Sequence, residues 1–162
     1  MSDKLNLSKN IKILICDFDG VFTDGGIFVG ENYQTFKKVS YKDLMGVSLA
    51  LKAGYKLAFV SGEKTAAIDL ICKKFKIEDN FQDIRNKKEV VLKILQKYSY
   101  NANDILYIGD DVNDIEAMKL AEYRIAPPNA NYKIKDVENI QFTNSFGGDG
   151  AFREVVDNLL II

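Results

Sequence analysis

The chain has no histidine and only two cysteines among its 162 residues. Without histidine, Ser-His-Asp and Cys-His nucleophile systems, histidine metal sites and phosphohistidine chemistry are excluded. Cys16 and Cys72 lie in apolar stretches without the spacing of a metal site, so we expect buried free thiols in a reducing compartment. Any catalysis must therefore rest on carboxylates and lysines.

Strong net charge and long apolar segments are also lacking. The formal net charge is −1, so no basic field attracts nucleic acid or an anionic membrane, and an anionic substrate would need local cations or a metal. The first ten residues lack the apolar centre of a signal peptide, and no apolar stretch approaches the ~18 residues of a membrane span. We expect a cytoplasmic protein with one domain over residues 1–162.

Apolar runs alternate with amphipathic segments, which is typical of a parallel α/β sheet. Strands are predicted at residues 11–17, 56–61, 104–109, 122–126 and 139–143, and helices at 43–53, 64–76, 86–98, 112–120 and 149–160. Residues 27–36 break the alternation and are predicted to form a β-hairpin that turns at residues 30–32. This hairpin is the centre of a predicted flap over about residues 25–40.

Two carboxylates follow the first predicted strand. Asp17 and Asp19 stand at positions i and i+2 of an extended chain and so point into one crevice, where like charges are costly unless a cation or a proton separates them. A second acidic group begins with Asp110 after another apolar run. Ligands of open α/β sheets bind beyond the carboxyl ends of the strands. The two groups therefore predict a magnesium site for phosphoryl chemistry, because oxygen ligands favour this cation.

The acids suit different roles in such a reaction. Asp17 suits an attacking carboxylate that forms an aspartyl-phosphate, and Asp19 suits a general acid for the leaving alcohol and then a base for water. Asp110 offers a further oxygen to the cation. Asp111 and Asp114 are expected to hold metal-bound waters or to orient their neighbours.

Three further residues complete the predicted site. Ser61 and the backbone at Gly62 can donate hydrogen bonds to phosphate, and Lys87 can neutralise charge on the nucleophile and the transferring group. Each feature alone also fits a turn, a helix cap or a surface lysine. Their occurrence in order, each at a strand end or a helix start, favours the catalytic interpretation.

The motif Asp-Phe-Asp-Gly-Val-Phe-Thr-Asp-Gly at residues 17–25 resembles the first motif of the haloacid dehalogenase superfamily of phosphatases. Its longer pattern is similar to one subgroup, which contains 3-deoxy-D-manno-octulosonate 8-phosphate (KDO 8-phosphate) phosphatases and nonulosonate 9-phosphate phosphatases. Ser61, Lys87 and Gly109-Asp110-Asp111-x-x-Asp114 match the later motifs of the superfamily. The ending Gly-Gly-x-Gly-Ala-x-Arg-Glu at residues 147–154 matches the subgroup.

The resemblance implies a Rossmann-like three-layer core with a hairpin flap and no cap domain. It implies Asp17 as nucleophile, Asp19 as acid and base, and Mg²⁺ held by Asp17, the backbone carbonyl of Asp19 and Asp110. It also implies a homotetramer in which a neighbouring subunit covers each active site. The apolar residues of the flap fit this assembly, and the alternative is a flap that folds onto its own domain.

The implied substrate is a 2-keto-3-deoxy sugar acid phosphate of cell-surface polysaccharide precursor biosynthesis. It is either KDO 8-phosphate, a precursor of lipopolysaccharide, or a nine-carbon nonulosonate such as KDN or sialic acid 9-phosphate. Eight-carbon enzymes usually have Gly-Arg after the second motif, whereas Gly62-Glu63-Lys64 looks like the nine-carbon branch. Glu63 and Lys64 are thus candidate substrate-binding residues, or simply residues of the first turn of a helix.

Other substrate contacts follow from the same resemblance. Lys42 and Asp43 match positions at which the subgroup contacts sugar or phosphate. Ile71 stands where the subgroup tends to have arginine. Lys74 is the nearest cation that matches the pattern, and Lys73 and Lys64 are alternative substitutes. The missing arginine weakens the expected clamp on a carboxylate.

Two functions of other classes use similar residues. A receiver domain phosphorylated on aspartate also needs acids, a lysine and magnesium, but its paired acids come early, whereas Asp110 and Asp111 come late. A non-catalytic oligomerisation module, as found fused to sugar-nucleotide cytidylyltransferases, would not need the intact acids.

Overall fold

The structure, a computed structural model, describes residues 4–160. Six parallel strands form one sheet in the order β5-β4-β1-β6-β7-β8. They are β1 (Ile13–Cys16), β4 (Lys56–Val60), β5 (Asp79–Phe81), β6 (Ile105–Ile108), β7 (Tyr123–Ala126) and β8 (Ile140–Phe142). Because β1 lies between β4 and β6, the carboxyl ends of these three strands lie next to one another. The side of the sheet at which the strands end is the carboxyl edge.

Among residues 4–160, the strands of the sheet alternate with five α-helices, except that no α-helix lies between β7 and β8. The helices are α1 (Tyr41–Lys52), α2 (Ala66–Phe75), α3 (Lys87–Tyr98), α4 (Ile115–Met118) and α5 (Ala151–Leu160). Short 3₁₀ turns lie at Ala102–Asp104 (η1), Val112–Asp114 (η2) and Tyr132–Asp136 (η3). Side chains of Ser40, Thr65 and Asn86 cap α1, α2 and α3 by accepting first-turn N–H groups, which fixes where these helices begin.

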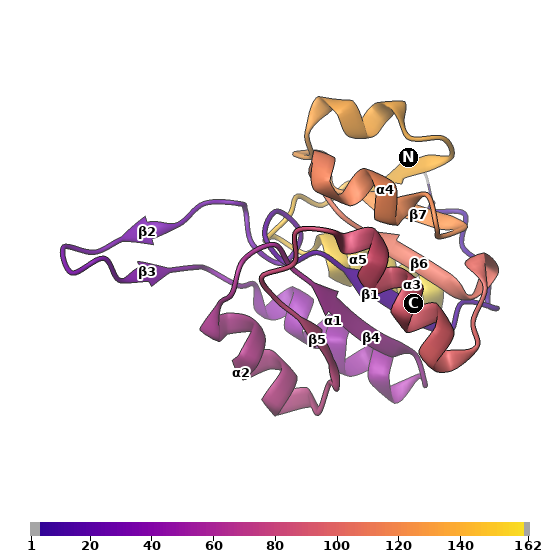
Figure 1. The fold of residues 1–162 in the computed structure, drawn as a ribbon, viewed down its shortest axis with the longest axis horizontal. Helices are drawn as coiled ribbons and strands as arrows, with labels where there is room; N and C mark the ends of the chain where they lie inside the picture. Colours follow the sequence, from indigo (N-terminus) through magenta and orange to yellow (C-terminus); the bar gives the residue numbers. More distant parts are fainter. Residues whose placement is uncertain (1–3, 161–162) are drawn as a thin grey trace.

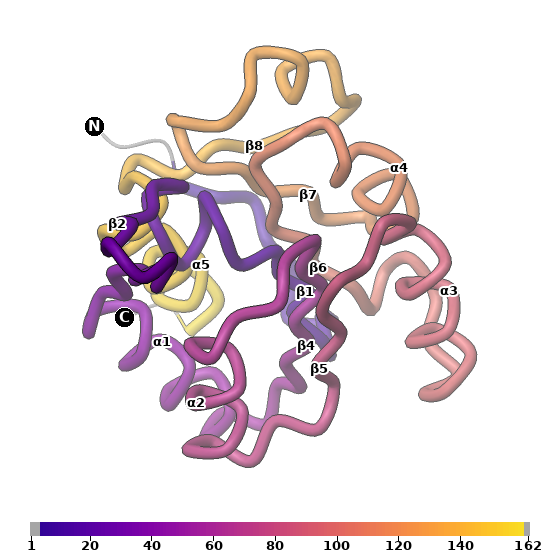
Figure 2. Tube along the Cα trace, turned by 60° about the vertical axis from the view of Figure 1, so that its left-hand side comes forward, coloured from indigo at the N-terminus to yellow at the C-terminus, as the bar shows by residue number. Residues whose placement is uncertain are grey.

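The strand residues alternate between two apolar layers. Leu14 and Cys16 of β1 pack with α1, α2 and α5, whereas Ile13 and Ile15 pack with α3 and α4. Figure 2 shows the sheet between these two groups of helices. The predicted three-layer α/β fold is therefore confirmed, and both faces of the sheet are covered, as a parallel sheet requires.

The hairpin consists of β2 (Phe28–Val29) and β3 (Thr35–Phe36), which pair antiparallel. Gly30 N–H donates to the Gln34 carbonyl at 2.8 Å, so the loop is wider than the predicted turn at residues 30–32. The hairpin projects from the body of the molecule (Figure 1). Among residues 4–160, no helix is long and apolar enough to cross a membrane.

Two predicted elements need correction. The strand β5 was not predicted. It has only three residues, two of them are the polar Asp79 and Asn80, and it is the outermost strand of the sheet. The helix predicted at 112–120 is the 3₁₀ turn η2 followed by the single turn of α4. The carboxylates of Asp111 and Asp114 bind backbone N–H groups there, which favours a tight turn over a regular helix start.

Candidate active site

Three strand ends bring the predicted acidic residues together. Asp17 follows β1, Ser61 follows β4, and Asp110 lies two residues after β6. The Asp17 N–H donates to the Ile108 carbonyl at 2.9 Å, which ties the first acid to the strand that carries the second acidic group. Carboxylate oxygens of Asp17, Asp110 and Asp114 lie within 4.8 Å of one another, a group that could hold a metal ion.

Lys87 is a buried cation between two of these carboxylates. Its Nζ lies 2.6 Å from Asp17 Oδ2 and 2.8 Å from Asp114 Oδ1, and its side chain is 0% exposed. Burial lowers the pKa of Lys87, but the charges of Asp114 and Asp17 outweigh it and raise the pKa above its ordinary value. The ammonium therefore stays charged beside Asp17, as predicted from its place at the start of α3.

Both carboxylate oxygens of Asp114 accept hydrogen bonds from groups inside the protein. Its Oδ1 accepts from Lys87 Nζ and the Tyr107 hydroxyl, each at 2.8 Å. Its Oδ2 accepts from the backbone N–H groups of Asp110 and Asp111 at 3.1 and 3.2 Å. With four donors on its two oxygens, Asp114 orients its neighbours and has no lone pair directed at a cation.

Asp110 keeps its place because Gly20 leaves room for it. A Cβ at Gly20 would lie 1.8 Å from Asp110 Oδ2, and the φ of +81° at Gly20 favours glycine. Burial, and then the charges of Asp114 and Asp111, raise the pKa of Asp110 to about 7. Burial and the charges of Asp114 and Asp110 also raise the pKa of Asp17, against the effect of Lys87. Oxygen donors with this excess of negative charge fit a hard divalent cation.

Asp111 is exposed, in contrast to the other acids of this group. Its Oδ1 accepts from the Val112 N–H at 2.7 Å and caps η2. The role expected for it at metal-bound water stays a prediction.

Asp19 lies at the mouth of the site, with a side chain that is 29% exposed. Its Oδ1 accepts from the Thr23 hydroxyl at 3.1 Å, and its Oδ2 lies 2.5 Å from Lys37 Nζ. No sequence motif predicts a role for Lys37. It is the first of two adjacent lysines after the hairpin, and nothing in the sequence distinguishes it from Lys38.

A cavity of about 730 Å³ opens beside Asp19, between the base of the flap and the start of α2. Glu63 and Lys64 line it, and their contact with a substrate stays a prediction. Ser61 is buried next to it, and its Oγ accepts from the Glu63 N–H at 3.2 Å. The hydroxyl hydrogen of Ser61 is therefore available to another acceptor.

The subgroup's glycine-rich ending packs directly on the catalytic loop. A Cβ at Gly147 would lie 1.7 Å from the Gly20 carbonyl oxygen, and the Gly148 N–H donates to the Val21 carbonyl at 3.0 Å. This close approach explains why glycines stand at both positions. The loop before α5 therefore supports the turn that carries Asp19.

Two other predicted substrate contacts have partners within the protein. Lys42 is exposed and pairs with Asp149 at 2.7 Å. Asp43 is buried, and its carboxylate accepts from the Gly150 and Arg153 N–H groups at 3.1 and 3.0 Å, which caps α5. This position does not support a contact between Asp43 and substrate. A buried side chain with backbone donors looks the same in sequence as an exposed acid at a helix start.

Lys74 lies near the carboxyl end of α2, which ends at the next residue, Phe75. Its Nζ stands 5.3 Å from the ring centroid of Phe75. Ile71 is buried in the apolar layer under α2. Within one chain, neither position therefore offers a cation to the cavity beside Asp19.

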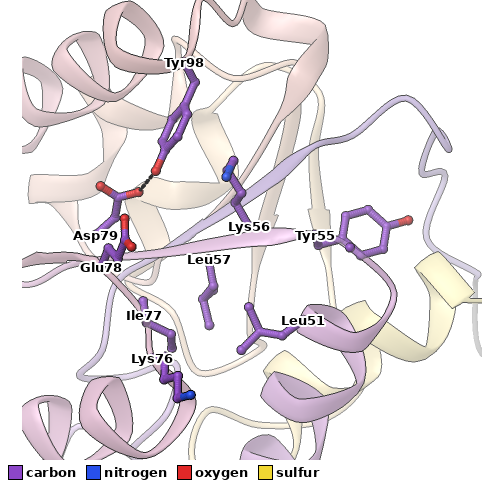
Figure 3. Close-up of a pocket in the computed structure, with 10 residues that line it drawn as sticks. Leu51, Tyr55, Lys56, Leu57, Lys76, Ile77, Glu78, Asp79 and Tyr98 are labelled. Atoms are coloured by element: carbon purple, nitrogen blue, oxygen red, sulfur yellow. Dashed lines mark hydrogen bonds between the residues drawn. The ribbon is translucent and has the colours of Figure 1, made fainter.

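A second cavity of about 300 Å³ lies at the opposite sheet edge, where β4 and β5 begin. Figure 3 shows its apolar floor, with Leu51 and Leu57, beneath the hydrogen bond from Tyr98 to Asp79. That bond measures 2.6 Å, and Lys97 also pairs with Asp79 at 2.7 Å. None of the predicted site residues lines this cavity.

The chain is similar to known proteins over almost its whole length. The chain is 30% identical over 161 residues to 3-deoxy-D-manno-octulosonate 8-phosphate phosphatase of Escherichia coli (strain K12), covering 99% of this chain and 85% of the relative. The family of haloacid dehalogenase-like hydrolases matches residues 81–150. The chain belongs to the haloacid dehalogenase superfamily. Within it, the chain falls in the capless subgroup of KDO 8-phosphate phosphatases, which are phosphoric monoester hydrolases.

Solved structures agree with this assignment. The KDO 8-phosphate phosphatase of Moraxella catarrhalis, in complex with a magnesium ion, a phosphate ion and KDO, superposes with a TM-score of 0.89 at 29% identity. The match covers 94% of this chain and 87% of that one. A cobalt-bound form of the Haemophilus influenzae enzyme gives a TM-score of 0.87 at 27% identity and covers 94% and 89%. Metal-bound neighbours and the acidic group together confirm the predicted kind of cofactor site.

Proposed function

We propose that the chain is a magnesium-dependent phosphatase that hydrolyses a 2-keto-3-deoxy sugar acid phosphate through an aspartyl-phosphate on Asp17. The observation that carries the proposal is the buried ammonium of Lys87 between Asp17 and Asp114, beside Asp110 at the carboxyl edge of the sheet. A receiver domain or a non-catalytic module has no need of a second acid at the position of Asp19. The expected cytoplasmic location and the single domain over residues 1–162 stay predictions.

The first chemical step is attack by a carboxylate oxygen of Asp17 on phosphorus. The new O–P bond forms as the bond to the sugar oxygen breaks, and that oxygen takes a proton from the carboxyl group of Asp19. Lys87 and the Ser61 hydroxyl stabilise the charge on the transferring group. In the second step, water attacks phosphorus and gives its proton to Asp19, which releases phosphate and restores the Asp17 carboxylate.

Asp17, Asp110 and the backbone carbonyl of Asp19 would hold Mg²⁺. When bound, the cation neutralises phosphate oxygens and the crowded carboxylates. Asp114 is not in this set, because four protein donors already occupy its oxygens. It fixes Lys87 and the turn that carries Asp110.

The substrate is a phosphorylated keto sugar acid of eight or nine carbons. The cavity beside Asp19 is large enough for such a molecule, and Glu63 and Lys64 face it from the first residues before α2. The relatives act on the eight-carbon KDO 8-phosphate, whereas Glu63 supports a nine-carbon nonulosonate. Hydroxyl groups of the longer sugar would be hydrogen-bonded by the Glu63 carboxylate.

A homotetramer would complete this site. The flap exposes apolar side chains that a monomer does not cover: Ile27 at 54%, Phe28 at 71%, Val29 at 64%, Tyr33 at 91% and Phe36 at 57%. Such a group of exposed apolar residues favours an interface. Its place at the rim of the cavity supports the proposal that a neighbouring subunit closes the active site, and Lys74 would then act only across subunits.

A substrate panel tests the proposal. Purified protein is given KDO 8-phosphate, KDN 9-phosphate, sialic acid 9-phosphate and simple phosphate esters, with and without Mg²⁺, and phosphate release is measured. We expect kcat/KM for one sugar acid phosphate to exceed that for the simple esters by at least about 100-fold. Equal weak activity on all esters would contradict the assignment of the substrate. Full turnover by Asp17→Asn would contradict the mechanism.

A further inference from the structure

We infer that Lys37 determines specificity by binding the carboxylate of the substrate, an assignment that rests on the proposed function. Lys37 directly follows β3, at the base of the flap. Its Nζ contacts Asp19 Oδ2 at 2.5 Å, and its side chain is only 11% exposed. Lys37 is one of the residues that line the cavity beside Asp19.

The cavity offers few cations to an anionic sugar. Of its lining residues only Lys37 and Lys64 carry positive charge. The arginine that the subgroup tends to have is replaced by Ile71, which is buried in the apolar layer. Lys87 is enclosed by Asp17 and Asp114 on the phosphate side. Within one chain, the carboxylate of a keto sugar acid therefore has its candidate partners at the flap and at the start of α2.

Lys37 is better placed for this role than Lys64. The ion pair with Asp19 already holds its side chain, whereas Lys64 is exposed. Ordering a free lysine costs side-chain entropy, and a lysine already held in an ion pair has lost most of that entropy. Two carboxylates can share one ammonium, because it has three donors. The substrate carboxylate would thus join Asp19 on Lys37.

This arrangement couples recognition to the reacting group. A substrate carboxylate that binds Lys37 draws the ammonium partly away from Asp19. Asp19 is the residue next to the bond that breaks. A phosphate ester without a carboxylate leaves the Lys37–Asp19 pair as it stands. The cation on the flap therefore favours sugar acids over neutral sugar phosphates.

The test compares Lys37→Met with the wild-type protein on two esters. The first is the sugar acid phosphate that the wild-type protein hydrolyses best, and the second is glucose 6-phosphate, which has no carboxylate. Loss of one charge-assisted contact is expected to lower kcat/KM for the sugar acid ester by about 10- to 150-fold. The value for glucose 6-phosphate reports what the lost charge does through Asp19 alone, so the loss on the sugar acid ester should exceed the loss on glucose 6-phosphate by at least about tenfold.

A second readout separates the carboxylate from the phosphate. Inhibition constants are measured for the two products, the free sugar acid and inorganic phosphate. Lys37→Met should weaken inhibition by the sugar acid and leave inhibition by phosphate unchanged. Lys37→Arg keeps the charge and should restore part of the loss. Lys38→Met removes the adjacent exposed lysine and serves as the control, with thermal unfolding to show that each variant folds.

The outcomes are distinct. An equal loss on both esters, or weaker inhibition by phosphate, would show that Lys37 acts on the reacting phosphate or through Asp19, and would overturn the inference. Unchanged kinetics of Lys37→Met would overturn it as well. In both cases the wild-type protein remains an active phosphatase. A wild-type protein without activity on any ester would overturn the proposed function itself.

Discussion

Binding of Mg²⁺ is expected to depend steeply on pH because of Asp110. Burial and the charges of Asp114 and Asp111 raise the pKa of this carboxyl to about 7. A divalent cation binds the ionised form, so protons and cation compete for it. One proton with a pKa of about 7 raises the apparent Kd about tenfold between pH 8 and pH 6. Burial and the charges of Asp114 and Asp110 also raise the pKa of Asp17, which makes the dependence steeper.

The same shift acts on the stability of the metal-free fold. The pKa of Asp110 in the folded state exceeds its ordinary value of 3.8. Its contribution to stability is therefore complete below about pH 4 and is lost as the pH rises through about 7. A shift of ~3 pKa units corresponds to an upper bound of ~4 kcal/mol. Asp110→Asn should accordingly raise the Tm of metal-free protein at pH 8, although it removes a proposed ligand.

The assay is calorimetric titration with Mg²⁺ at pH 8, 7 and 6 and constant ionic strength. Thermal unfolding in a chelator gives the stability of the metal-free protein at each pH. Glu122→Gln is the control, because this acid is exposed and stands just before β7, at the opposite end of the strands from Asp110. An apparent Kd that changes less than twofold between pH 8 and pH 6 would refute the reasoning. So would a metal-free Asp110→Asn protein that unfolds below the wild-type temperature at pH 8.

Three further changes have distinct expected results. Gly20→Ala should abolish Mg²⁺ binding in calorimetry, because the added Cβ displaces the Asp110 carboxylate. Gly54→Ala should bind Mg²⁺ normally, since Gly54 also has a positive φ of +93° but nothing lies within 4 Å of the added Cβ. Equal affinities of the two variants would contradict this expectation. Burial raises the pKa of Asp43 to about 6, so its stabilising contribution is full below pH 4 and lost through pH 6. The free energy of unfolding in urea should therefore rise for Asp43→Asn relative to the wild type by up to ~3 kcal/mol between pH 4 and pH 6. Parallel plots of this free energy against pH would contradict the expectation. Phe28→Asp in the flap should lower the mass measured by light scattering, while Tyr132→Asp, 72% exposed on η3, should not; a tetramer in both cases would exclude the flap interface.

Most of the fold could be predicted from the sequence because its strands are short apolar runs between amphipathic helices. The strand β1, for example, is four buried residues that end at the first acid. The strand β5 could not be found this way. It contains Asp79 and Asn80 and is held by pairing with β4 and by Lys97 and Tyr98 of α3, contacts that come from distant parts of the chain.

The site divides in the same way. Asp17, Ser61 and Asp110 follow strand ends, so sheet topology alone brings them to one edge. Lys37 could not be identified, because its contact with Asp19 depends on how the flap leaves the sheet. Asp43 differs from an exposed acid only through backbone donors of α5, more than a hundred residues away. Long-range packing decides such positions, and periodicity carries no signal of it.

The covalent step on Asp17 is the central claim, and trapping it is the most direct measurement. Protein turning over its best sugar acid phosphate with Mg²⁺ is quenched in acid within milliseconds and reduced with borohydride, which converts an aspartyl-phosphate to homoserine. Mass spectrometry of the peptide that contains residues 13–22 then identifies the modified residue. The account predicts homoserine at position 17 and none in Asp17→Asn, which should also lose turnover. An unmodified Asp17 during full turnover, or modification of Asp19 instead, would contradict it.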